Sequence, residues 1–138
     1  MRSLQILETC LYTPDLAAAE RFYVDVLGLE VYSRNEGRSV FFRCGDRMLL
    51  LFNPQRTRVR DAAVPAHGTD GPGHAAFAVP DNEIDSWRAR LAQYDVSIEQ
   101  EVSWPRGGHS LYFRDPAGNS IEIVSPLLWG ISEESLFR

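Results

Sequence analysis

The spacing of apolar residues in the first half of the chain predicts a strand followed by a helix. Residues 4–12 are rich in apolar and β-forming residues, and Thr13, Pro14 and Asp15 then provide a helix start, with proline tolerated in the first turn. Apolar side chains recur at helical spacing until Gly28, which is placed to end the helix as a left-handed C-cap residue. The apolar face of this helix consists of Leu16, Ala19, Phe22, Tyr23, Val26 and Leu27.

Three strands follow this helix, and the whole pattern then recurs in the second half of the chain. Short apolar runs separated by turn residues predict strands at 29–33, 39–43 and 47–52. The second half predicts a strand at 74–79, a helix with Ile84, Trp87, Leu91 and Tyr94 on one face, and strands near 96–101, 110–114 and 120–125. The sequence therefore predicts an α+β fold made of two tandem β-α-β-β-β modules.

Two short sequence matches support an internal duplication. Pro14-Asp15 in the first half corresponds to Pro80-Asp81 in the second, and residues 39–43 (SVFFR) correspond to residues 110–114 (SLYFR). The identities are few, but they occur in the same order within matching strand and helix patterns. We interpret the chain as one domain that contains two copies of the same module.

The segments outside the two modules differ in character. The modules span about 4–53 and 74–126, and the linker between them, residues 54–73, is rich in Pro, Gly and Arg with little periodicity. Such a segment is typical of a functional lid or of a solvated connector, and we favour the lid. The tail, residues 127–138, is too apolar for a free end and is expected to pack against the domain or a second chain through Leu127, Leu128, Trp129, Ile131, Leu136 and Phe137.

Composition and charge restrict the class of partner. The 138 residues, with 44% hydrophobic and 24% charged content, suffice for one globular domain with a sizeable core. The net charge of −5 argues against a nucleic-acid or anionic-membrane partner, which would require a basic surface, and favours a small molecule. Because neither a membrane span nor a signal peptide is evident, we expect a cytoplasmic protein.

The inventory of reactive side chains narrows the chemistry further. Cys10 and Cys44 are the two cysteines, too few for a disulfide framework and not spaced as a zinc pair, so reduced thiols are expected. All 14 basic residues are Arg, which excludes Schiff-base chemistry and Lys general bases. Carboxylates, three histidines, tyrosines and two thiols remain as acids, bases and ligands.

Three polar residues in apolar strands are candidates for one internal site. Glu8 and His74 each precede the aspartate of the matched Pro-Asp pair by seven residues, and Glu122 lies within SIEIV on the last predicted strand. If these side chains face inward, burial is costly unless they are paired, hydrogen-bonded or bound to a metal. Each residue alone also has an ordinary alternative: a glutamate on a solvated face, a structural histidine, or Glu122 facing water between Ile121 and Ile123.

Three stretches resemble the vicinal oxygen chelate superfamily: TPDLAAAERFYVDVLGLEV at 13–31, GPGHAAFAVP at 71–80 and SLYFRDPAGNSIEIVSP at 110–126. This superfamily contains glyoxalase I, fosfomycin-resistance thiol transferases, methylmalonyl-CoA epimerases, extradiol dioxygenases and bleomycin-resistance proteins. The likeness covers residues 4–126. It implies a curved, mostly antiparallel sheet around a metal and substrate cavity, and a homodimer in which Glu8 is often contributed by the partner of the chain carrying the other ligands.

The resemblance also implies a metal site. The family's ligands come from the first strand of each module and from the last strands, which correspond to Glu8, His74 and Glu122 in this chain. One divalent ion (Mn, Fe, Co, Ni or Zn) per site suits this oxygen-rich set. Glyoxalase I and the epimerases have a fourth ligand where this chain has Leu49 or Leu50. By resemblance to glyoxalase I, Glu8 or Glu122 is the expected general base.

The expected activity follows from this ligand set. Our first hypothesis is a metal-dependent enzyme of lyase, isomerase or thiol-addition type, acting on a small substrate that chelates the metal through adjacent oxygens. A ring-cleaving or other Fe(II) dioxygenase is the alternative enzyme, disfavoured because such sites usually have two His and one carboxylate. A drug- or metabolite-binding protein like the bleomycin-resistance proteins is the alternative without catalysis, although those proteins typically lack the ligands.

Five further residues are candidate substrate contacts. Strand alternation places Cys10 on the face of Glu8, and Tyr112 matches a substrate-contacting tyrosine of the fosfomycin-resistance enzymes. His67 in the linker, His109 beside a Gly-Gly pair and the nearby cation Arg106 are expected to approach the open side of the site. The ordinary alternatives are a core aromatic for Tyr112 and solvated surface positions for the others.

Overall fold

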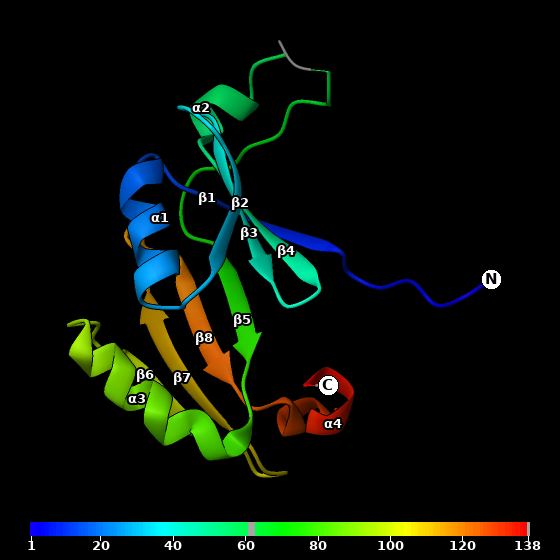
Figure 1. The fold of residues 1–138 in the computed structure, drawn as a ribbon, viewed down its shortest axis with the longest axis vertical. Helices are drawn as coiled ribbons and strands as arrows, with labels where there is room; N and C mark the ends of the chain where they lie inside the picture. Colours follow the sequence, from blue (N-terminus) through cyan, green and yellow to red (C-terminus); the bar gives the residue numbers. More distant parts are fainter. Residues whose placement is uncertain (61–62, 138) are drawn as a thin grey trace. The chain divides into compact units, whose positions relative to one another are not determined.

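The first half of the chain folds into a strand, a helix and three strands. The computed structural model describes residues 1–60 and 63–137. The first half contains β1 (Glu8–Tyr12), α1 (Leu16–Asp25), β2 (Glu30–Asn35), β3 (Ser39–Cys44) and β4 (Arg47–Phe52), as Figure 1 shows. Its sheet has the strand order β1-β4-β3-β2, in which β1 and β4 are parallel and the other pairs antiparallel.

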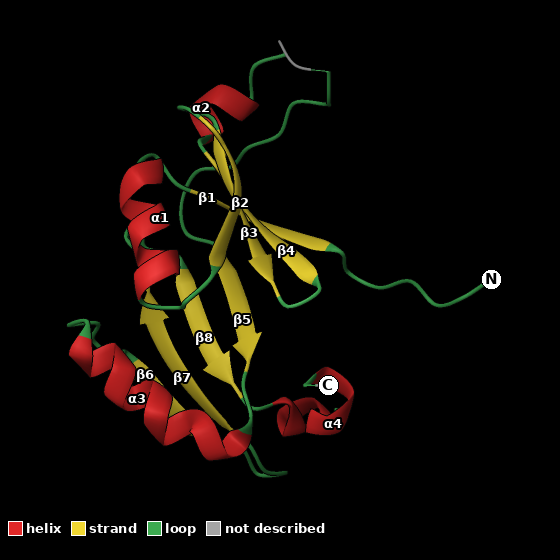
Figure 2. Ribbon diagram, viewed as in Figure 1, coloured by secondary structure: helices red, strands yellow, loops and turns green. Residues whose placement is uncertain are grey.

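The second half repeats this arrangement. It contains β5 (His74–Ala78), the short helix η1 (Asp81–Glu83), α3 (Ile84–Gln93), β6 (Gln100–Ser103), β7 (His109–Arg114) and β8 (Ser120–Val124). The strand order is β5-β8-β7-β6, with β5 and β8 parallel and the other pairs antiparallel (Figure 2). The predicted α+β fold of two β-α-β-β-β modules is therefore confirmed, with a separate, mostly antiparallel four-stranded sheet in each module.

The contacts divide the chain into two units that follow these modules. The first unit comprises Met1–Gly73 together with Pro116–Asn119, and the second comprises His74–Asp115 and the chain from Ser120 onward. The short segment Pro116–Asn119 thus lies between β7 and β8 in the sequence but belongs to the first unit.

Helix α1 begins directly after Asp15, as the sequence predicted, but it ends at Asp25 with Val26 as its C-cap, so Gly28 lies two residues beyond the cap. The side chain of Asp15 accepts a hydrogen bond from the Ala18 backbone N–H at 3.0 Å, and Gly28 has a φ of +73°. Asp15 is the N-cap, so Pro14 lies before the helix and not in its first turn. Tyr23 on the buried face is fully enclosed and packs against Phe42 of β3, with ring centroids 5.7 Å apart. This contact anchors the helix on its sheet.

Three segment boundaries differ from the prediction. Residues 4–7 precede β1 and are exposed, and Tyr94 follows the last turn of α3 with 41% of its surface exposed. The strand predicted near 96–101 begins only at Gln100. The reason is the end of α3, where Asp95 adopts a φ of 56° and the Val96 N–H donates to the Leu91 carbonyl at 2.9 Å. The end of the helix therefore includes Val96, which the apolar pattern assigned to the strand.

The linker and the tail contain short helices. In the linker, α2 (Pro54–Thr57) is capped by the Asn53 side chain, and the His67 N–H donates to the Thr57 carbonyl at 3.0 Å. The tail forms η2 (Pro126–Trp129) and α4 (Glu133–Leu136). The tail residues with the largest exposed apolar side chains, at 40–76%, are Leu127, Trp129, Ile131, Leu136 and Phe137. Leu127 lies close to Gly107 of its own unit, and packing of the other four against the domain stays a prediction. Packing against a second chain stays a prediction.

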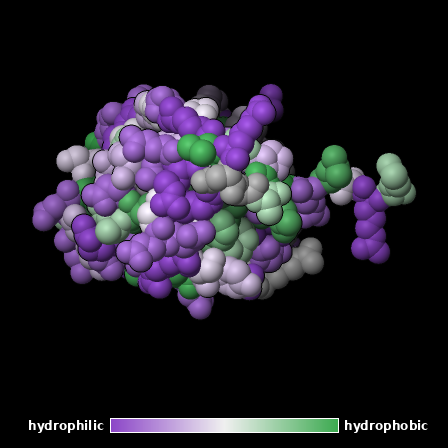
Figure 3. Space-filling view, turned by 90° about the horizontal axis from the view of Figure 1, so that it is seen from above, coloured by the Kyte–Doolittle hydropathy of each residue, from purple (hydrophilic) through white to green (hydrophobic). Residues whose placement is uncertain are grey.

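The polarity of the surface and the free state of the two cysteines agree with what the composition predicted. The face shown in Figure 3 is largely hydrophilic, with apolar residues scattered among polar ones. Cys10 is exposed, Cys44 is half-buried, and both are free. Within residues 1–60 and 63–137, the helices are too short and too polar for any of them to cross a bilayer.

Candidate metal site

His74 and Glu122 face each other across two parallel strands. His74 is the first residue of β5, and Glu122 lies at the centre of β8, opposite Ala76. The His74 Nδ1 is 2.9 Å from the Ser120 carbonyl oxygen, which can only accept a hydrogen bond, so the ring proton is assigned to Nδ1. The opposite nitrogen, Nε2, is 3.3 Å from Oε1 of Glu122. In the neutral ring, Nε2 therefore presents a lone pair to the carboxylate.

Glu122 is a buried carboxylate, and its two neighbours in the sequence belong to the core of the second unit. It is 5% exposed, between Ile121 at 0% and Ile123 at 1%. Strand alternation turns the two isoleucines to one face and Glu122 to the other. The alternative in which Glu122 faces bulk water is therefore wrong, and a buried carboxylate requires partners.

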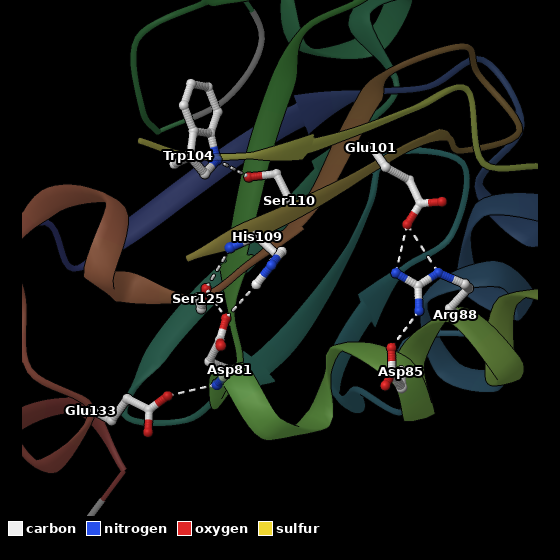
Figure 4. Close-up of polar contacts among 9 residues, drawn as sticks. All are labelled: Asp81, Asp85, Arg88, Glu101, Trp104, His109, Ser110, Ser125 and Glu133. Atoms are coloured by element: carbon white, nitrogen blue, oxygen red, sulfur yellow. Dashed lines mark hydrogen bonds and ion pairs between the residues drawn. The ribbon is translucent and has the colours of Figure 1, made fainter. Parts of the chain in front are cut away.

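Two side chains of the second unit supply those partners. The Ser110 hydroxyl on β7 donates to Oε2 of Glu122 at 2.6 Å, and the Trp104 Nε1–H donates to the Ser110 oxygen at 2.8 Å. Figure 4 shows the second of these bonds. The two carboxylate oxygens consequently have different roles: Oε2 is hydrogen-bonded within the protein, and Oε1 is directed at His74.

Tyr112 completes the immediate surroundings. It lies directly opposite Glu122 in the β7–β8 register, and its ring stacks on that of His74 with centroids 6.4 Å apart and an interplanar angle of 26°. Burial, and then the negative charge of Glu122, raise the pKa of the Tyr112 hydroxyl. The phenol stays protonated at neutral pH and can donate a hydrogen bond beside the His74–Glu122 pair.

The donor chemistry of this pair fits a divalent metal. Two acceptors that face each other repel unless a cation lies between them. Ligand atoms about 2.0–2.2 Å from one ion are roughly 3.0–3.5 Å apart at ordinary coordination angles, which the Nε2–Oε1 distance of 3.3 Å matches. The Ser120 carbonyl that orients His74 is a typical outer partner of a metal-binding imidazole. A proton on Nε2 is the other cation that would satisfy the pair.

Glu8 lies in the first unit, at the position equivalent to His74. It is the first residue of β1, as His74 is the first residue of β5. It lines a groove of about 610 Å³ in that unit, together with Arg34, Arg38, Phe41, Leu50, Phe52 and His67. In the described parts of each unit, no three His, Cys, Asp or Glu side chains are grouped as metal ligands. Ligation of one ion by Glu8, His74 and Glu122 thus stays a prediction.

The strand registers decide which leucine occupies the fourth ligand position. Glu122 pairs with Ala76 on one side and Tyr112 on the other, and Leu50 pairs with Cys10 and Phe41 in the same relation. Leu50, not Leu49, is therefore the equivalent of Glu122. Its side chain faces the groove of the first unit.

Two candidate substrate contacts, Cys10 and His67, lie in the first unit. The Cys10 sulfur is 4.0 Å from the Tyr12 hydroxyl, so both share the face of Glu8 as predicted. The Tyr12 hydroxyl is 2.7 Å from Nδ1 of His67, whose ring also packs edge-on against Phe52 with centroids 4.6 Å apart. The linker therefore contributes His67 to one wall of the groove.

The remaining two candidates lie apart from Glu122 in the second unit. The Nδ1 of His109 is 2.9 Å from Oδ1 of Asp81, which also accepts a bond from the Ser125 hydroxyl at 2.7 Å (Figure 4). Alternation along β7 places His109 on the face opposite Ser110. Arg106 lines a smaller groove of about 330 Å³ with Trp104, Pro105, Leu128 and Trp129. Contact of His109 or Arg106 with a substrate stays a prediction.

A match to a model of a protein family shows which superfamily the chain belongs to. The model described as "Glyoxalase/Bleomycin resistance protein/Dioxygenase superfamily" matches residues 5–123. The chain belongs to this superfamily. The match extends through both modules and includes Glu8, His74 and Glu122, so the resemblance drawn from the sequence is confirmed.

Three similar proteins carry different activities in their names. A crystal structure described as lactoylglutathione lyase from Agrobacterium tumefaciens is 46% identical, covers 95% of this chain and 100% of its own, and has a TM-score of 0.91. Glutathione transferase FosA from Serratia marcescens is 30% identical over 79% of this chain and 72% of its own length. Catechol-2,3-dioxygenase from Bacillus subtilis is 29% identical over 76% of this chain, which spans only 35% of that enzyme.

Proposed function

We propose that this protein is a divalent-metal-dependent enzyme of lyase, isomerase or thiol-addition type that acts on a small substrate with two adjacent oxygens. The observation that carries the proposal is the His74–Glu122 pair, in which an oriented imidazole and a buried carboxylate present two acceptors 3.3 Å apart. Ionisable groups arranged in this way favour a bound cation. With Glu8 as the third ligand, the two carboxylates balance the charge of a divalent ion.

The protein's own residues supply the remaining chemistry. A bound divalent ion polarises a substrate carbonyl or stabilises an oxyanion. Glu8 and Glu122 are the candidate general bases, and their contacts favour Glu8. Glu122 is buried and held by Ser110, whereas the Glu8 side chain is exposed and makes no hydrogen bond or ion pair within the described residues of its unit. The stacking of Tyr112 on His74, together with its protonated hydroxyl, supports a role for Tyr112 as a hydrogen-bond donor to the substrate.

The similar proteins support a thiol-containing substrate or cosubstrate. The names of the lyase and of the transferase both refer to glutathione. The apolar Leu50 at the fourth position distinguishes this site from the four-ligand sites expected of glyoxalase I. A dioxygenase is supported by the catechol enzyme but disfavoured by a set with a single histidine.

The proposal is tested by measuring the metal content per chain of the protein as purified, whether it is a monomer or a dimer. We expect about one divalent ion per chain, and a Kd for added Zn²⁺ or Co²⁺ that rises about 100-fold or more in His74→Ala and Glu122→Gln. Glu134→Gln, at an exposed position of α4, is the matched control and should bind metal normally. Unchanged metal binding in both site variants would refute this metal site. A wild-type protein without a stoichiometric divalent ion would favour a sequestering protein.

A substrate screen then separates the reaction classes. The metal-loaded enzyme is tested with a hemithioacetal of glutathione, with an epoxide plus a thiol, and with a catechol under oxygen. Turnover of either of the first two supports the proposed class, and Glu8→Gln should lower kcat more than it weakens metal binding if Glu8 is the base. Oxygen uptake with the catechol that depends on Fe(II) would establish the dioxygenase instead.

We also propose that the active form is a homodimer with Glu8 supplied by the partner chain. The exposed apolar tail residues are consistent with an additional chain contact. Dilution through the dimer dissociation constant, followed by analytical ultracentrifugation, should weaken metal binding in parallel. A monomer with the same metal affinity would rule out shared ligation.

A further inference from the structure

The two carboxylate oxygens of Glu122 have different partners, because two consecutive hydrogen bonds that start at Trp104 end on only one of these oxygens. The indole Nε1–H of Trp104 donates to Ser110, and Ser110 donates to Oε2 of Glu122. We infer that Trp104 and Ser110 are positioning residues that fix the Glu122 carboxylate, so that Oε1 is held ready for a metal shared with His74. This inference rests on the proposed function, because it assigns a role to residues behind one of the proposed ligands.

The direction of the two hydrogen bonds is determined by the chemistry of the groups. An indole N–H can only donate, and an ionised carboxylate can only accept. The Ser110 hydroxyl, which has one proton, must therefore accept from Trp104 and donate to Glu122. A hydroxyl without the indole bond would have greater freedom to rotate, so Trp104 fixes the orientation of the donor that Glu122 uses.

Burial makes this arrangement costly to break. Ser110 is 0% exposed and Glu122 is 5% exposed, and they lie on adjacent strands whose register is fixed by the Tyr112–Glu122 and Ser110–Val124 pairs. A rotation of the carboxylate away from Ser110 would remove this hydroxyl donor from a carboxylate that is only 5% exposed. The bond of 2.6 Å is in the short range of hydroxyl–carboxylate bonds.

Trp104 also has a solvent-accessible side, which provides a matched control. Its ring lines the 330 Å³ groove with Arg106, Leu128 and Trp129, while its nitrogen is bonded to Ser110. Trp129 lines the same groove and is 76% exposed. Trp104→Phe and Trp129→Phe thus make the same chemical change in one groove, but only the first removes a bond to Ser110.

Titration with Zn²⁺ alone, by calorimetry at fixed pH, tests the inference. Ser110→Ala should weaken zinc binding about 10–100-fold, as expected for loss of an outer partner of a metal ligand. Trp104→Phe should weaken it about 3–10-fold, because the serine hydroxyl remains but is less well oriented. Ser110→Thr, which keeps the hydroxyl, and Trp129→Phe should stay within about 2-fold of the wild type.

A spectroscopic signature separates positioning from a general structural role. The indole N–H resonance of Trp104, identified by its absence in Trp104→Phe, should shift when Zn²⁺ is added to the wild type. The same resonance should not respond in Ser110→Ala, where the path to Glu122 is interrupted. Metal-free melting curves confirm that each variant is folded, and Trp104→Phe decides the matter if Ser110→Ala does not fold.

The outcomes distinguish this inference from the proposed function. If the wild type binds zinc through His74 but Ser110→Ala and Trp104→Phe retain wild-type affinity, the positioning role is wrong and the proposed function stands. If the wild type itself does not bind zinc, the proposed function fails and the positioning of a ligand fails with it. Weakened binding in these two variants, with both controls unchanged, supports the inference.

Discussion

Leu50 occupies in the first sheet the register position that Glu122 occupies in the second. Leu50 lies between Cys10 and Phe41, as Glu122 lies between Ala76 and Tyr112. The four equivalent strand positions of the two modules thus hold three potential donors and one apolar side chain. The duplication therefore explains both the number of proposed ligands and the position of the one that is absent.

Restoring a donor at position 50 should strengthen metal binding. Leu50→Glu places a second carboxylate beside the groove that Glu8 lines, and a higher ligand charge increases the affinity for a divalent cation. We expect Zn²⁺ to bind about tenfold or more tightly by calorimetry. Without metal, the nearly buried carboxylate should lower the melting temperature, because Leu50 is only 7% exposed.

Leu49→Glu is the matched control for that experiment. Leu49 is 2% exposed, and strand alternation directs it to the opposite face, so its replacement should destabilise the protein without any gain in metal affinity. Equal zinc affinity in Leu50→Glu and the wild type would contradict the equivalence of position 50 with a ligand position.

Much of the fold could be predicted because local patterns determine it. Asp15 is a capping residue whose side chain marks a helix start by itself, and it was found in that role. Gly28 has the expected positive φ but lies two residues beyond the C-cap Val26. The strand expected near 96–101 was misplaced because the same apolar residues could continue a strand or close a helix. The hydrogen bond from the Val96 N–H to the Leu91 carbonyl shows that Val96 belongs to the end of the helix.

The site could be predicted only in part, because its supporting contacts are distant in sequence. Glu122 was singled out as a polar residue in an apolar strand, yet its partner Ser110 is 12 residues away and its position follows from the strand register. The role of Trp104 follows only from the structure, in which its Nε1–H donates to the Ser110 hydroxyl. No local spacing indicates that Asn119 bonds to Tyr12, which is 107 residues earlier.

Replacing Asn119 should strongly destabilise the first unit. Its Oδ1 accepts from the Gly73 N–H at 2.7 Å, its Nδ2 donates to the Tyr12 carbonyl at 3.2 Å, and the residue is 1% exposed. Asn119→Ala leaves two backbone groups without these partners, which should cost about 2–4 kcal/mol in urea unfolding. Asn82→Ala, at an exposed position, should change stability by less than about 0.5 kcal/mol. Equal stability of the two variants would exclude a structural role for the Asn119 bonds.

Removing the Tyr12 hydroxyl should loosen the linker around His67. Tyr12→Phe abolishes the 2.7 Å contact with His67 Nδ1 and leaves the edge-on contact with Phe52. The loss of about 1 kcal/mol should raise hydrogen exchange of the His67 amide, which donates to Thr57, by about fivefold. Tyr32→Phe, at a 60% exposed position, is the control. Unchanged exchange in Tyr12→Phe would show that the hydroxyl does not hold the linker.

Acid should weaken the second unit partly through Asp81. The hydrogen bonds from His109 and then Ser125 hold the pKa of the Asp81 carboxyl below its ordinary value. Since the folded pKa is lowered, the ionised form contributes stability above the unfolded pKa, and this contribution is lost as pH falls through the folded value. The loss should therefore occur below about pH 4. Because the side chain is 44% exposed, solvent screening keeps the effect small.

Asp81→Asn isolates this contribution, because the amide keeps an oxygen at the acceptor position but has no charge to lose. At pH 7 we expect Asp81→Asn to be about 1 kcal/mol less stable than the wild type in urea unfolding, and the difference should vanish near pH 2–3. Asp85→Asn, whose side chain is 94% exposed, should cost less than about 0.5 kcal/mol at pH 7. A stability difference for Asp81→Asn that persists unchanged at pH 2 would show that the lost interaction is not that of the ionised carboxylate with His109 and Ser125.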